Sequence, residues 1–166
     1  MAKRKSDNGN GRSLTTQQSV NSAIKVICDI MRRSNCAGAL QYVPELTWIL
    51  FLRILDEQET GEAAAHEAVG AEFTPSLEAP YRWQDWADPG GQKRQELTGA
   101  TSVAGDLFTF VNADLIPHLR GLRDRPNATP RQKVISEIMS GVERSRVDSE
   151  KNFLDILDKV HEISAA

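Results

Sequence analysis

The sequence predicts an all-α fold, a bundle of about five helices interrupted by a long irregular segment at about residues 73–102. Apolar residues recur at three- and four-residue spacing through most of the chain, which is typical of helices that bury one face. No stretch shows sustained alternation of apolar and polar residues, so a β-sheet is not expected. The 166 residues, 40% of them apolar, suffice for one hydrophobic core.

The chain opens with residues 1–16, which are basic and polar and lack an apolar period, so we expect a disordered tail. Residues 17–166 are expected to form one helical domain. Its first helix is predicted from about Gln17 to Arg33, because Arg32 and Arg33 suit the negative end of the helix dipole. The residues predicted on its buried stripe are Val20, Ala23, Ile24, Ile27, Cys28 and Met31.

The central helix is predicted from about Tyr42 to Thr60, and its first half is apolar on every side, which requires a position inside the molecule. Pro44 is tolerated if it lies in the first turn. Gly61 is a plausible stop, although the alanine-rich residues after it could extend the helix. A membrane span is excluded, because crossing a bilayer takes roughly 20 apolar residues and Arg53 interrupts this run.

The irregular segment from Phe73 to Ser102 contains three prolines and two adjacent glycines, which favour loops. Trp83 and Trp86 lie within it, and such aromatic rings can stack on nucleic-acid bases. Only Arg82 accompanies them as a basic neighbour. The favoured interpretation is therefore that both rings fill the core.

Three further helices are predicted in the second half of the chain. One runs from about Val103 to Arg123 and is expected to kink or break at Pro117, after Ile116. A short helix begins at Thr129 and Pro130, a cap and first-turn pair, and stops at Gly141. The last helix begins near Ser149, with Asp148 or Ser149 as its cap.

Motifs for chemistry are missing from the sequence. Cys28 and Cys36 form no CxxC pair, and no histidine is spaced to complete a metal site with them, so Cys28 is expected to be a core residue and Cys36 a reduced loop thiol. No glycine-rich phosphate loop occurs, and the three histidines are isolated. We therefore expect no catalytic residue, cofactor site or metal site in these 166 residues.

Charge is distributed unevenly. The net charge is −3 and the isoelectric point about 5.6, which argues against a protein that coats nucleic acid indiscriminately. Residues 56–72 contain six acids and no Lys or Arg, whereas residues 120–146 are basic, so one end of the molecule is expected to be acidic and another basic. The basic residues are candidates for contact with DNA phosphates or with an acidic protein, and ordinary solvated surface is the alternative. They are Arg120, Arg123, Arg125, Arg131, Lys133, Arg144 and Arg146.

The residues from Val20 to Glu59 resemble the N-terminal helical domain of the modification (methyltransferase) subunit of type I restriction-modification systems. In that family a helix with a Leu-Arg-like ending is followed by a short loop, a tyrosine and an LxFLKxLxD-like helix end. The matching positions are Ile30, Met31 and Arg32, then Tyr42, then Leu50, Phe51, Leu52, Arg53, Leu55 and Asp56. Tyr81, Arg82 and Trp83 match the family's tryptophan-containing loop, and residues 146–163 match its last helix before the catalytic domain.

The resemblance implies a non-catalytic assembly and DNA-clamping role. The full subunit would use S-adenosylmethionine to methylate adenine N6 in a bipartite DNA site, working with a specificity subunit, a second modification subunit and the restriction subunit. It would be cytoplasmic and would not contact a membrane. The S-adenosylmethionine site and the NPP[YF] adenine pocket are absent from these residues, so the catalytic domain is expected downstream.

Two other functions stay open from the sequence. The chain could be a free-standing helical module that binds another protein and has no role in DNA binding or methylation. It could also be a complete enzyme, which is disfavoured because no catalytic constellation occurs in it.

Overall fold

The computed structural model describes residues 17–34 and 38–163, and it confirms the all-α prediction. The expectations for residues 1–16 and for Cys36 lie outside the described residues. The helical elements in chain order are α1 (Gln17–Arg33), α2 (Ala39–Ala68), α3 (Trp83–Trp86), α4 (Gln92–Thr98), α5 (Asp106–Thr109), a π-helical turn (Phe110–Leu115), α6 (Ile116–Arg120), a 3₁₀ turn (Leu122–Asp124), α7 (Pro130–Met139) and α8 (Glu150–His161).

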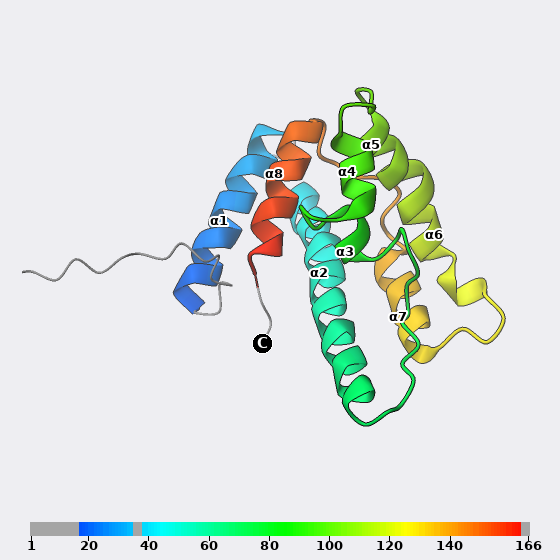
Figure 1. Cartoon of the computed structure of the whole chain (residues 1–166). Helices are drawn as coiled ribbons and strands as arrows, with labels where there is room; N and C mark the ends of the chain where they lie inside the picture. Colours follow the sequence, from blue (N-terminus) through cyan, green and yellow to red (C-terminus); the bar gives the residue numbers. More distant parts are fainter. Residues whose placement is uncertain (1–16, 35–37, 164–166) are drawn as a thin grey trace, which may run out of the picture.

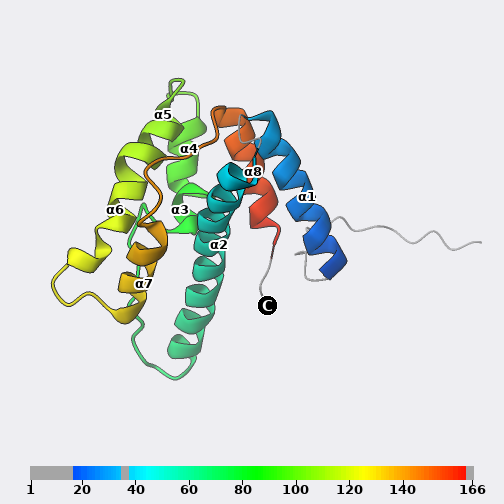
Figure 2. The same ribbon diagram turned by 180° about the vertical axis from the view of Figure 1, so that it is seen from behind.

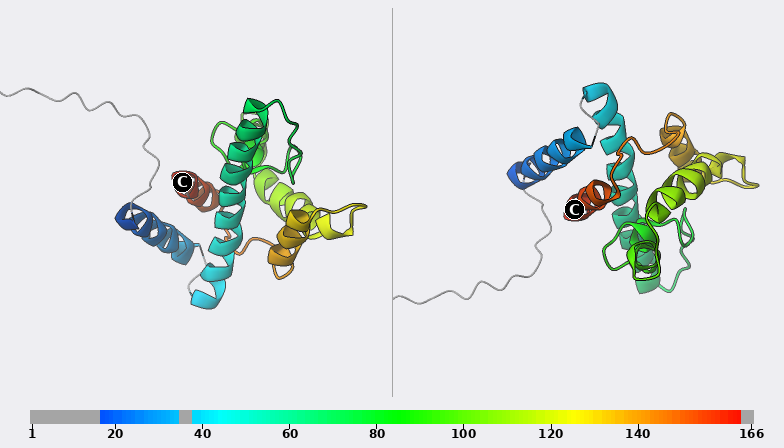
Figure 3. Two further views of the ribbon diagram at one scale, coloured as in Figure 1. Left: turned by 90° about the horizontal axis from the view of Figure 1, so that it is seen from below. Right: turned by 90° about the horizontal axis from the view of Figure 1, so that it is seen from above.

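Helix α2 runs through the middle of the molecule (Figure 1). Views from below and from above show α1 and α8 on one side of it and α5 to α7 on the other (Figure 3). The first and last helices of the domain therefore pack against each other, although they are far apart in the sequence. The predicted bounds of α1 are confirmed, and Ala23, Ile27 and Met31 are buried along it. Cys28 is only half-buried.

Helix α2 is longer at both ends than the sequence indicates. It begins at Ala39, so Pro44 lies inside the helix and not in its first turn. It also continues through Gly61 and the alanine-rich residues to Ala68. A glycine inside a helix costs only about 0.5–1 kcal/mol relative to alanine, which the good helix formers around Gly61 offset.

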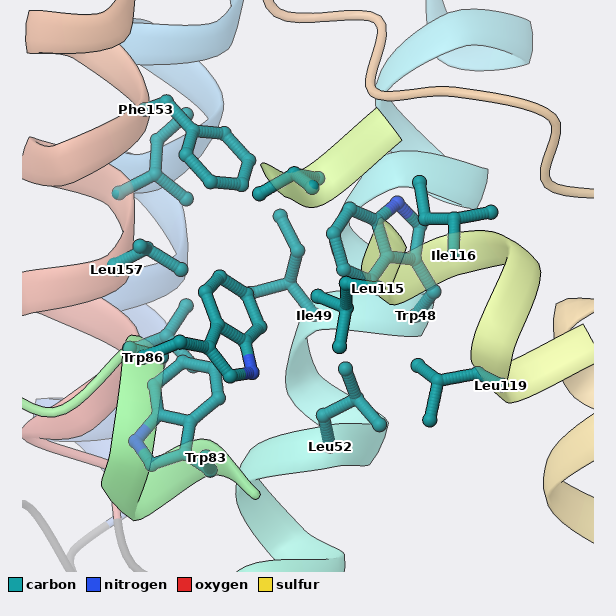
Figure 4. Close-up of a cluster of buried hydrophobic side chains, with 14 of the residues drawn as sticks. Trp48, Ile49, Leu52, Trp83, Trp86, Leu115, Ile116, Leu119, Phe153 and Leu157 are labelled. Carbon is teal, nitrogen blue, oxygen red and sulfur yellow. The ribbon is translucent and has the colours of Figure 1, made fainter. Parts of the chain in front are cut away.

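The core forms where α2, α3, α6 and α8 meet (Figure 4). Trp83 and Trp86 are fully buried there, which confirms that they are core residues. The ring of Trp86 stacks on Phe153 of α8 with centroids 6.4 Å apart, and it contacts Trp83 edge-on at 5.9 Å. The segment 73–102 is thus less irregular than predicted, because α3 and α4 lie within it.

The helix predicted from Val103 to Arg123 consists of several shorter pieces. Val103, the first residue of the predicted helix, lies before α5 and is 68% exposed, with its N–H bonded to the Asp106 carboxylate. The helical hydrogen bonding changes in the π-helical turn, where the N–H of Ile116 donates to Val111 O. The irregularity therefore precedes Pro117, and α6 continues past this proline to Arg120.

The last two helices begin as predicted. Thr129 caps α7, accepting a hydrogen bond from the N–H of Gln132, while the Gln132 side chain accepts from the N–H of Thr129. Of the two candidate caps for α8, the structure selects Ser149, whose hydroxyl accepts from the N–H of Asn152. Among the described helices, none combines the length and apolar character that a membrane crossing requires.

Replacing Trp86 by alanine is expected to lower the free energy of unfolding by about 3–5 kcal/mol, because a large ring is removed from a closed core. Urea unfolding followed by circular dichroism measures this. Val103→Ala is the control and should change stability by less than about 0.5 kcal/mol, since this side chain is exposed. Equal effects of the two substitutions would contradict the assignment of Trp86 to the core.

Candidate partner and nucleic-acid surface

The structure distributes the seven basic candidates over two regions. Five lie around the 3₁₀ turn and α7: Arg120 ends α6, Arg123 lies in the turn, Arg125 follows it, and α7 carries Arg131 and Lys133. The other two, Arg144 and Arg146, lie in the connection between α7 and α8, beside the start of α2. Figure 2 shows this connection passing near the upper end of α2.

Arg131 is held inside the domain by two carboxylates of α2. Its guanidinium binds both oxygens of Glu62, at 2.7 and 2.9 Å, and approaches Glu59 Oε2 at 3.2 Å. Glu59 is almost fully buried and also accepts hydrogen bonds from the N–H and hydroxyl of Ser76. Gln132 donates to Ser76 O, so α2, the segment after it and α7 are joined at one point.

This network shifts the pKa values of its members. Hydrogen bonding to Arg131 lowers the pKa of Glu62, and the same bond raises the pKa of Arg131. Both groups are therefore charged throughout the neutral range.

Arg125 also pairs with an acid of this chain. Its guanidinium lies 2.9 Å from Glu78 Oε1, and hydrogen bonding to Arg125 lowers the pKa of Glu78. Both side chains are largely exposed, so this pair adds little stability. Nearby, the ring of His118 stacks on Tyr81 at 3.7 Å, and burial lowers the pKa of His118.

Four of the seven candidates are exposed and have no carboxylate partner among residues 17–34 and 38–163. They are Arg120, Arg123, Lys133 and Arg144. Arg146 takes part in a separate interaction with Glu45, described next.

A hollow of about 520 Å³ lies between the start of α2 and the connection from α7 to α8. Glu45, only 2% exposed, contributes to its wall. The carboxylate accepts hydrogen bonds from the indole N–H of Trp48 at 3.0 Å and from the hydroxyl of Ser145. Burial raises the pKa of Glu45, because the loss of hydration outweighs these bonds and the favourable influence of Arg146.

Ser145 anchors the connection from α7 to α8 in a way that leaves its two arginines exposed. Its side chain bonds to Glu45 and its N–H to Asn112 Oδ1, so Ser145 is buried against the core, as is Val147. Arg144 and Arg146 alternate with these two residues and are exposed.

The acidic and basic runs of the sequence are not at opposite ends of the molecule. Glu59 and Glu62 from the acidic run pair with Arg131 from the basic run. The expectation of one acidic end and one basic end was therefore wrong for these residues. Spacing along the sequence carries no information about which helices will lie together.

No group of three or more potential metal ligands comes together within the described residues. What the geometry provides is a helical frame, exposed cations and exposed apolar side chains at the start of α2. Leu40 is 91% exposed and Val43 is 52% exposed.

The family model of the HsdM N-terminal domain matches residues 20–142 of this chain. The chain belongs to this family. It is also 33% identical over 124 residues to the methylase subunit of the type I restriction enzyme EcoEI from Escherichia coli, a match that covers 74% of the chain and 22% of that subunit. The resemblance seen in residues 20–59 is thereby confirmed.

Two solved structures are similar to this HsdM N-terminal domain. One is the crystal structure of a modification subunit of a putative type I restriction enzyme from Vibrio vulnificus YJ016, with a TM-score of 0.76, 31% identity, and coverage of 92% of this chain and 32% of the other. The second comes from work on complex assembly and conformational transition of the type I R-M system, with a TM-score of 0.67, 32% identity, and coverage of 91% and 27%. The chain thus spans about a third or less of these relatives.

Sequence reasoning missed the buried polar residues of this HsdM N-terminal domain. Glu45 could have been found, since it lies three, four and seven residues before Trp48, Ile49 and Leu52, on the most buried face of the helix. Ser136, a buried hydrogen-bonding residue of α7, carries no comparable signal, because serine is common on exposed helix faces.

Glu45 generates a pH-dependent prediction. A carboxyl whose pKa is raised in the folded state binds its proton more tightly there. Its contribution to the stability of the fold is therefore greatest at low pH and falls as the pH rises through the folded pKa. Glu45→Gln removes this titration, so the stability of the wild type relative to Glu45→Gln should fall as the pH rises from about 4. Urea unfolding at a series of pH values measures the difference.

Glu45→Ala is the matched variant, and it should be destabilising at every pH. It leaves the buried indole N–H of Trp48 and the hydroxyl of Ser145 without an acceptor, at a cost of about 2–4 kcal/mol. A constant difference between wild type and Glu45→Gln across the pH range would contradict the raised pKa.

Arg131→Ala is expected to destabilise the domain by about 1–3 kcal/mol, because Glu59 remains buried without its cation. Arg131→Lys should restore only part of this loss, since lysine cannot form the two-pronged contact with Glu62. Thermal unfolding of the single variants and of the Arg131→Ala/Glu59→Gln pair measures the coupling. Strictly additive effects in that pair would show that Arg131 and Glu59 do not interact.

Proposed function

We propose that this chain is the assembly and DNA-clamping domain of a type I restriction-modification adenine methyltransferase subunit. In this proposal the full subunit uses S-adenosylmethionine to methylate adenine N6 at a bipartite site. It works with a specificity subunit, a second modification subunit and the restriction subunit. The domain itself contributes contacts and not chemistry.

The observation that carries the proposal is the likeness to a modification subunit over 92% of this chain, with a TM-score of 0.76. Because the match covers only 32% of that subunit, methyl transfer is assigned to residues other than these. The buried carboxylates of Glu45 and Glu59 fit this division, because their hydrogen bonds join elements of the domain.

The assembly role is supported by apolar side chains that this domain leaves uncovered. Leu40 and Val43 are exposed in the first turns of α2. Their chain neighbours Gln41 and Pro44 line the hollow with Arg144 and Arg146. Val134 and Ile138 are exposed one helical turn apart on α7. Apolar centres bordered by arginines are common in protein interfaces.

The DNA-clamping role is supported by exposed cations of α6, the 3₁₀ turn and α7, which are Arg120, Arg123 and Lys133. Lysine and arginine are the residues that most often contact DNA phosphates, and such contacts fix the position of a protein on the duplex without reading its sequence. Sequence recognition is accordingly assigned to the specificity subunit.

The test is to co-express the subunit that carries this domain with its specificity subunit and to compare the wild type with Leu40→Glu/Val43→Glu. The double variant is expected to reduce complex formation in size-exclusion chromatography with light scattering, because it places two charges in an apolar contact. It should leave thermal unfolding of the domain unchanged, since both side chains are exposed. Val103→Glu, which alters another exposed valine, is the control and should assemble normally.

Methyl transfer to duplex DNA from labelled S-adenosylmethionine completes the test. The assembled complex should transfer methyl groups to adenine, and this chain alone should not. The proposal would be overturned if the wild-type subunit neither assembled with the specificity subunit nor bound DNA. That result would favour a free-standing protein-interaction module.

A further inference from the structure

Three of the exposed cations border two neighbouring hollows that meet at the 3₁₀ turn Leu122–Asp124. A hollow of about 480 Å³ is lined by Arg120 and Arg123, and a second of about 330 Å³ by Arg123 and Lys133. Arg123 contributes to both. The turn lies at the edge of the molecule farthest from α1 (Figure 1).

The turn that presents these cations is fixed from inside. The hydroxyl of Ser136, fully buried on α7, accepts a hydrogen bond from the N–H of Arg123 at 2.9 Å and donates to Leu119 O at 3.0 Å. Leu122, between these elements, is also completely buried. The backbone at Arg123 is therefore held in place before any ligand binds, which lowers the entropy lost on binding.

Arg120, Arg123 and Lys133 form no ion pair within the described chain, whereas the nearby Arg125 and Arg131 do. Arg131 is committed to Glu59 and Glu62, and Arg125 to Glu78. No carboxylate of the described chain lies within ion-pair distance of Arg120, Arg123 or Lys133.

Two acids, Asp124 and Glu137, also line these hollows. They lower the net positive charge of this surface, so its long-range attraction for polyanions is weak. Discrete contacts with individual phosphates fit this arrangement better than a broad basic patch does, and they agree with the net charge of −3.

We propose that Arg120, Arg123 and Lys133 are the residues by which this domain contacts the phosphate backbone of duplex DNA, whereas Arg125 and Arg131 hold the domain's own elements together. The inference rests on the proposed DNA-clamping function and divides the seven basic candidates by what their side chains already bind. Arg144 and Arg146 belong to the separate hollow at the start of α2.

The experiment measures the affinity of the assembled complex for a 30-base-pair duplex without a recognition site, by fluorescence anisotropy at several salt concentrations. Each lost phosphate contact is expected to reduce the slope of log K against log salt by about 0.9. Arg120→Ala/Arg123→Ala/Lys133→Ala should therefore reduce it by nearly three times this amount. The charge-preserving Arg120→Lys/Arg123→Lys should keep the wild-type slope.

Two controls separate contact from folding. Arg131→Ala should lower the unfolding temperature but leave the salt slope unchanged, because its charge is already neutralised by Glu59 and Glu62. Lys25→Ala, which removes an exposed lysine of α1, should change neither.

The outcomes distinguish this inference from the function on which it rests. If the wild-type complex binds DNA with a slope that the triple substitution does not change, the inference alone is overturned. Loss of specificity-subunit binding by the triple variant would also overturn it and would identify the surface as a protein contact. A wild-type complex that assembles but does not bind DNA at any salt concentration would overturn both the inference and the clamping role.

Discussion

The burial of α2 is the constraint on which the rest of the structure depends. Ile54, on the opposite side of α2, is 42% exposed, so the helix is not enclosed on every side as its sequence predicts. Trp48, Ile49, Leu52 and Leu55 are all buried and form one wide stripe along the helix. The chain covers them by placing α8, with α1 outside it, on one side of α2 and the α3–α6 segment on the other (Figure 3). The two tryptophans of α3 fill the remaining space between these groups.

The same helix also fixes the irregular segments through two buried carboxylates. Glu45, near the start of α2, holds the connection from α7 to α8 through Ser145. Glu59, fourteen residues later, holds the segment after α2 through Ser76 and holds α7 through Arg131. These bonds explain why two connections without regular secondary structure run close against the core. A buried carboxylate is costly, and here its hydrogen bonds compensate part of that cost.

Local signals in the sequence were sufficient for some elements. The apolar stripe from Ala23 to Met31 predicted α1 correctly, and Thr129 with Pro130 predicted the start of α7. Both signals are local, because amphipathic periodicity and helix caps depend on residues within a few positions of each other. The breaker residues were less informative. Gly61 does not end α2, because packing of the whole helix outweighs one unfavourable residue. The kink or break was predicted at Pro117, but the irregularity is the π-helical turn that precedes this proline.

The candidate contact surface was predictable only in part, and for a different reason. The sequence shows which residues are basic, but whether a cation is available depends on which acid the fold brings beside it. Arg131 and Lys133 are two positions apart on one helix, yet the first faces α2 and its carboxylates while the second faces solvent. The acidic run of α2 therefore acts on the basic run from within the molecule. Its carboxylates pair with Arg131 and so help to hold α7 against α2. The other basic side chains near α6 and α7 stay exposed, where a partner of opposite charge can reach them.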